Sequence, residues 1–87
     1  MMTQDKVKRT TVHIKGRSYT IVGNEKSEHI RLIAGLVDDK MKEIHEKNKS
    51  LDTTQLAVLT ALNTMNDYMK LQEDYEILQN LIDEKED

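Results

Sequence analysis

The chain has 87 residues, enough for one small domain, with 37% hydrophobic residues, no Phe, Trp or Cys, and three Tyr. This composition excludes a disulfide framework and a thiolate metal site, and it favours oligomerisation over a self-sufficient core. The net charge of −3 is unevenly distributed: residues 1–50 carry 11 Lys/Arg and 7 Asp/Glu (+4), whereas residues 51–87 carry 2 and 9 (−7).

No segment approaches the roughly 20 consecutive apolar residues of a membrane-spanning helix. The first nine residues are polar and charged, without the apolar stretch of a secretory signal. We therefore expect a cytoplasmic protein.

Residues 1–8 are predicted to form a flexible arm, and residues 9–22 a β-hairpin. Two segments of alternating polarity flank a turn at Lys15-Gly16 or Gly16-Arg17. In either register one face of the ribbon is apolar, and it carries Val12, Ile14, Tyr19 and Ile21. A two-stranded ribbon is marginal alone, so this face must pack on a helix or extend a partner's sheet.

A first helix is predicted at about 27–47, with Ser27 as its N-cap. Its apolar residues form two rows, one of Ile30, Ile33, Val37, Met41 and Ile44, the other of Leu32 and Leu36. With the hairpin this helix completes a head of the α+β class, residues 9–50.

The second helix has the clearest start signal. Asp52 and Gln55 form a capping-box pattern, and Leu51 can staple to Leu56. No Gly or Pro follows, so residues 51–87 are predicted to form one long oligomerisation helix with a frayed acidic end. At 1.5 Å per residue it is roughly 45–50 Å long, too long for the head to cover.

The far half of this helix has a heptad seam, and its near half is apolar over most of its circumference. More than two helices should therefore meet there, although the charge pattern selects neither parallel nor antiparallel packing. The residues predicted to mediate oligomerisation are Leu59, Leu62, Met65, Tyr68, Leu71, Tyr75, Leu78 and Ile82.

Signals of catalysis are absent, with no Gly-rich phosphate loop, no Cys and no Ser in a nucleophile-elbow setting. No two of the three His have the spacing of a helical ligand pair, and the adjacent Asp38 and Asp39 indicate a solvated helix face. We expect no enzyme activity, cofactor, metal or small-molecule substrate.

The basic residues of the head allow two interpretations, a solubilising surface or a docking patch for an acidic protein. The candidate docking residues are Lys15, Arg17, Arg31 and Lys42. No Arg-rich or aromatic-interleaved patch supports nucleic-acid binding.

Several stretches, in this order and spacing, resemble the ZapA family of FtsZ-ring-associated cell-division proteins, of the Gram-positive type. They are Thr10 to Gly16, Tyr19 to Gly23, Leu36 to Met41, Leu51-Asp52, Leu56 to Asn63, Asp67-Tyr68 and Lys70-Leu71. Together they span about residues 9–80.

The resemblance implies dimerisation through the heads and tetramerisation through antiparallel pairing of the long helices. It also implies binding to FtsZ at midcell and bundling of its filaments. We expect no nucleic-acid or membrane partner. Another coiled-coil scaffold is the main alternative, and a small nucleic-acid-binding dimer fits the acidic tail less well.

Overall fold

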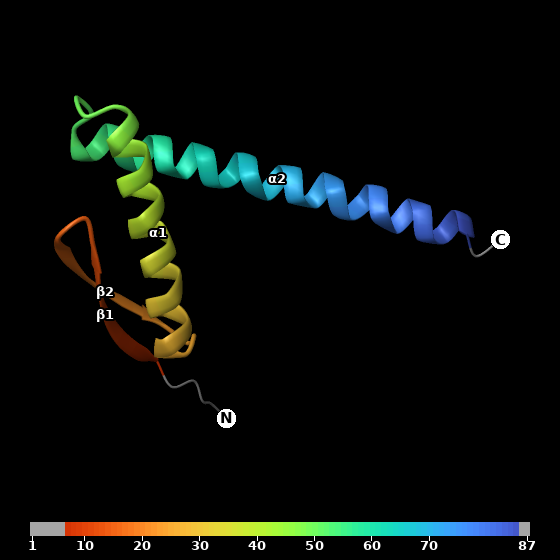
Figure 1. Cartoon of the computed structure of the whole chain (residues 1–87). Helices are drawn as coiled ribbons and strands as arrows, with labels where there is room; N and C mark the ends of the chain where they lie inside the picture. The colour runs from red at the N-terminus through yellow and green to blue at the C-terminus, as the bar shows by residue number, and fades with distance from the viewer. Residues whose placement is uncertain (1–6, 86–87) are drawn as a thin grey trace.

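The computed structural model describes residues 7–85 and contains a hairpin followed by two helices (Figure 1). The elements are β1 (Lys8–Ile14), β2 (Arg17–Gly23), α1 (Ser27–Lys47) and α2 (Thr53–Lys85). The predicted α+β fold class is confirmed. The predicted arm lies outside the described residues except for Val7 and Lys8, and Lys8 already belongs to β1; the last two residues of the acidic end also lie outside them.

The hairpin turns at Lys15 and Gly16, the first of the two predicted positions, since Ile14 pairs with Arg17. Both turn residues have positive φ, 54° and 79°. This is the pattern of a two-residue type I′ turn, whose twist matches that of the strands.

The apolar face of the hairpin is covered unequally. Val12 and Tyr19 are paired across the strands and so share a face, as predicted. However, α1 packs mainly against β1, which leaves Val12 4% exposed and Tyr19 44% exposed. The buried apolar residues of the described chain are few: Val12, Ala34, Met41 and Leu56.

Helix α1 begins differently from the prediction. Lys26, with extended backbone, is the cap residue, and no side chain caps the helix. Ser27 is instead the first helical residue, and its hydroxyl bonds the buried Thr10 hydroxyl of β1 at 2.8 Å. The buried Thr10 hydroxyl would be costly to leave without a hydrogen bond, and Ser27 provides its partner. Ser27 therefore links β1 to α1 instead of capping α1.

Helix α2 starts as predicted, with a reciprocal capping box. The Asp52 carboxylate accepts from the Gln55 backbone N–H at 2.8 Å, and Gln55 Oε1 accepts from the Asp52 backbone N–H at 3.1 Å. Leu56, at the position predicted for the staple, is 1% exposed. The burial of Leu56 shows that the start of α2 packs against the head.

Only the first part of α2 lies near α1, and the rest projects away as an arm (Figure 1). Lys40 Nζ and Asp67 Oδ2 form an ion pair at 2.9 Å that links the two helices. The radius of gyration is 18.0 Å, whereas a compact chain of this length would have about 12 Å. The distal arm therefore has no partner within the described chain.

Among residues 7–85, no helix combines the length and apolarity needed to cross a membrane.

Candidate self-association surface

The distal seam of α2 is an exposed apolar strip. Its five residues, Tyr68, Leu71, Tyr75, Leu78 and Ile82, are 46–68% exposed. Their 3,4,3,4 spacing places them along one side of the helix. Large apolar side chains in such a row mark a contact surface more often than a solvated face.

The seam extends further toward the head than the sequence prediction had it. Ala57, Ala61 and Thr64 continue the same 4,3,4 spacing back from Tyr68, and they line a cavity of about 590 Å³ in the angle between the helices. Val37 and Met41 of α1 form its other wall. The prediction did not include these positions among the oligomerisation residues because Ala and Thr are small; counting them as seam residues would have revealed the longer repeat.

The residues predicted to mediate oligomerisation do not all lie on this strip. Leu59 is half-buried, and Met65 lines the cavity. Leu62 is exposed on a different side of α2, in a second apolar row with Val58 and Met69. At 100° per residue, Leu62 lies about 160° around the helix from Thr64. The near half of α2 thus presents apolar surface in two directions.

Helix α1 adds a third exposed apolar surface. Leu32 and Leu36, the predicted second row, are exposed, as is the neighbouring Ile33. A groove of about 360 Å³ adjoins the larger cavity and shares Val37 and Thr64 with it. The apolar rows of both helices thus meet in the angle between α1 and α2, which we call the elbow.

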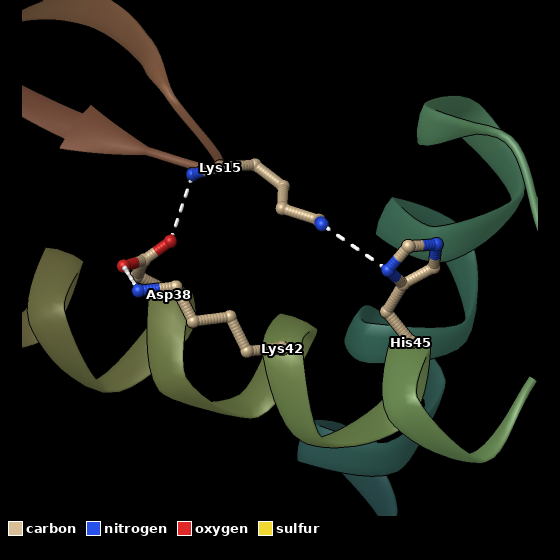
Figure 2. Close-up of polar contacts among 4 residues, drawn as sticks. All are labelled: Lys15, Asp38, Lys42 and His45. Carbon is tan, nitrogen blue, oxygen red and sulfur yellow. Dashed lines mark hydrogen bonds and ion pairs between the residues drawn. The ribbon is translucent and has the colours of Figure 1, made fainter. Parts of the chain in front are cut away.

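Two of the four predicted docking residues, Lys15 and Lys42, meet at one carboxylate (Figure 2). Asp38 Oδ1 accepts from the Lys15 backbone N–H at 2.8 Å, and Asp38 Oδ2 pairs with Lys42 Nζ at 3.0 Å. The Lys15 ammonium lies 3.3 Å from His45 Nδ1. Asp38 was predicted to be a solvated helix-face residue, but its side chain is only 20% exposed and holds the hairpin turn.

This arrangement alters the acid–base properties of the groups involved. The Lys15 backbone N–H and then the Lys42 ammonium hold the pKa of the Asp38 carboxyl below its ordinary value. The Asp38 carboxylate in turn raises the pKa of Lys42. The charge of Lys42 is therefore already partnered within the head.

The other two predicted docking residues, Arg17 and Arg31, are exposed. Neither has a carboxylate within 4.0 Å in the part of the chain that the structure describes. Arg17 lies next to the turn and opposite Ile14. Arg31 lies seven residues before Asp38, on the same side of α1. Of the four predicted docking residues, Arg17 and Arg31 are thus the two whose side chains form no ion pair or hydrogen bond within the described head.

Within residues 7–85, no three His, Cys, Asp or Glu side chains are grouped so as to hold a metal ion.

Comparison with known proteins gives consistent results. A family model described as cell division protein ZapA matches residues 10–87. Cell division protein ZapA of Oceanobacillus iheyensis is 59% identical over 86 residues, covering 99% of this chain and 100% of that protein. The protein of the same description from Bacillus subtilis is 53% identical over 85 residues, covering 98% and 100%.

A solved structure has the same fold. It is described as a ZapA mutant dimer from Geobacillus stearothermophilus, with 48% identity and a TM-score of 0.70. The match covers 94% of this chain and 95% of that one. The resemblance predicted from the sequence is confirmed, and the chain belongs to the family of cell division protein ZapA.

Proposed function

We propose that this chain is a non-enzymatic cell-division adaptor that binds FtsZ in the cytoplasm at midcell and cross-links its filaments through self-association. The observation that carries the proposal is the exposed apolar seam, on an arm beyond the reach of the chain's own head. Family membership supports the cell-division context. The seam supports a cross-linking role within it.

A second copy of the chain is the proposed occupant of the seam. The Geobacillus relative, 48% identical, is described as a dimer. Burying one Leu contributes roughly 1.5–3 kcal/mol, so a row such as Leu71 and Leu78 favours pairing of arms. Because the near half of α2 has apolar rows in two directions, one copy can contact more than one neighbouring helix, which supports a tetramer.

Cross-linking follows from placing binding heads at both ends of a paired arm. Once one head is bound, the next contact is effectively intramolecular, and avidity can exceed single-site affinity by about 10²–10⁴. The exposed Arg17 and Arg31 are the proposed contacts for an acidic surface of FtsZ. Lys15 and Lys42 would then contribute mainly by holding the tip in place.

Three measurements test the proposal. The chain should co-sediment with GTP-assembled FtsZ and increase the pelleted filament mass, whereas duplex DNA should show no gel shift at the same concentration. Light scattering across a dilution series should show a tetramer that dissociates to dimers. A self-associating chain that leaves FtsZ in the supernatant would contradict the partner. A gel shift that weakens steeply with salt would favour the nucleic-acid alternative.

A further inference from the structure

The tip of the hairpin is attached to α1 at two points through a single residue, Lys15 (Figure 2). Its backbone N–H donates to Asp38 at 2.8 Å, and its ammonium lies 3.3 Å from His45 Nδ1. Asp38 and His45 are seven residues apart, so they lie two turns apart on the same side of α1. The contacts span 23 and 30 residues of sequence and join the two halves of the head.

The two attachments differ in chemistry. A lysine ammonium is only a donor, so the second bond needs a neutral His45 with its lone pair on Nδ1 and its proton on Nε2. Histidine is the side chain that ordinarily changes charge between about pH 5 and 8. When His45 takes up a proton at Nδ1, the acceptor is lost and two cations face each other. The first attachment survives over that range, because the pKa of Asp38 is already held below its ordinary, acidic value.

Groups on the hairpin and on both helices determine how the charge of a protonated His45 ring is accommodated. It lies in the last turn of α1, where the helix dipole favours a cation. From the hairpin it faces the Lys15 ammonium. On its own helix Lys42 lies three residues earlier, and its ammonium pairs with Asp38. From α2, the first turn has no acidic residue, and the cap carboxylate of Asp52 is bonded to the Gln55 N–H.

We propose that His45 is a proton-operated latch for the hairpin tip. Neutral His45 holds the Lys15 ammonium on α1. Protonated His45 releases it and leaves the tip attached through Asp38 alone. The proposal does not depend on the identity of the partner, since every group in it belongs to this chain.

The test is an NMR titration of the full chain from about pH 8 to about pH 5.5, the range in which histidine changes charge. The backbone amide signals of Lys15 and Gly16 should shift with the same midpoint as the His45 ring signals. In His45→Gln, which keeps a neutral acceptor, the shift of both amides should disappear. The matched controls His13→Gln and His29→Gln remove the other two histidines and should leave it intact.

A second variant separates the latch from a general loosening of the head. Lys15→Met keeps the backbone N–H for Asp38 but removes the ammonium. The amide at position 15 should then no longer respond to pH in this range, while the His45 ring still titrates. A persistent amide shift in either His45→Gln or Lys15→Met would overturn the proposal, as would amides that do not titrate in the unmodified chain.

Discussion

Two residues in the hairpin turn have positive φ, and only Gly16, which has no Cβ, adopts it without strain. At other residues this left-handed conformation brings Cβ close to the following carbonyl. Lys15 nevertheless adopts it, and its backbone N–H is bonded to Asp38. The turn is thus stabilised by glycine at one position and by a tertiary hydrogen bond at the other.

The same substitution at two glycines should have opposite effects. Gly16→Ala should lower the free energy of unfolding by about 1–2 kcal/mol, because no steric contact is added and only the backbone is strained. Gly35, inside α1 with open space around it, should accept Ala and gain about 0.5–1 kcal/mol. Thermal unfolding at one fixed chain concentration measures both, and equal effects would contradict the type I′ turn.

The depressed pKa of Asp38 predicts a pH dependence of stability. Its contribution is present above the pKa of the unfolded chain, about 3.9, and is lost as the pH falls through the lower pKa of the folded chain. Asp38→Asn should therefore be less stable than the unmodified chain at pH 7, because the amide oxygen still accepts from Lys15 but no longer pairs with Lys42.

That difference should shrink toward zero well below the ordinary pKa of the carboxyl. Urea unfolding of both proteins at neutral pH and in strong acid measures it. Asp39→Asn, at the exposed neighbouring position, serves as the control and should change little at either pH. A difference that stays constant with pH would show that the charge of Asp38 is not what stabilises the tip.

At the scale of elements, local signals predicted the fold and long-range contacts escaped prediction. The hairpin, both helices and the capping box follow from residues close in sequence, as with Asp52 and Gln55. The role of Ser27 could not be predicted this way, because its partner Thr10 is 17 residues away. The hydrogen bond from the Lys15 backbone N–H to Asp38 spans 23 residues and was missed for the same reason.

The candidate self-association surface was likewise predicted only in part. The distal seam could be predicted, because large side chains such as Leu71 and Leu78 mark the heptad clearly. Its continuation through Ala57, Ala61 and Thr64 was overlooked, because small residues give a weak hydrophobic signal although their spacing continues the repeat. Only the position of α1 against them reveals the cavity at the elbow.

A charge placed in the distal seam should break the larger assembly. Leu78→Glu removes roughly 1.5–3 kcal/mol of burial per chain and adds the cost of an unpaired carboxylate, several kcal/mol after relaxation. We expect the proposed tetramer to become a dimer with unchanged helix content, as measured by sedimentation velocity and circular dichroism. The dimer should bind FtsZ filaments but bundle them poorly.

Gln79→Glu is the matched control, because it adds the same charge one residue away, off the seam. It should remain a tetramer. If Leu78→Glu also remains a tetramer, the distal seam is not the contact between arms. If it becomes a dimer that bundles as well as the unmodified chain, cross-linking does not depend on the arms.

At the scale of the whole molecule, the head and the arm differ in net charge as well as in shape. The basic half of the sequence forms the head, and the acidic half forms the arm. An acidic partner would be attracted to the head and repelled by the arm, and these exposed charges act over about 8–10 Å at physiological salt. Partner binding should therefore be confined to the ends of the assembly.

Reversing one charge at the hairpin tip tests this arrangement. Arg17→Glu should weaken co-sedimentation with FtsZ by roughly 3- to 10-fold, the scale of one exposed ion pair lost and made repulsive, without changing assembly size. Lys26→Glu makes the same charge change near the start of α1, away from the tip, and should have a smaller effect. Binding that resists both Arg17→Glu and added salt would contradict an electrostatic contact at the tip.

Because α2 contains no Gly or Pro, the arm is one continuous helix of fixed length. Its 33 helical residues give a length of about 50 Å. The number of helical residues therefore sets the distance between the head and the seam. Seven residues inserted directly after Tyr68, which still lines the cavity beside α1, would move the head about 10 Å outward from Leu71 and keep the seam nearly in phase. Four inserted residues would move the head about 6 Å and also turn it by about 40° relative to the seam. If the arms bridge filaments as proposed, the longer insertion should change mainly filament spacing, and the shorter one should also change filament orientation.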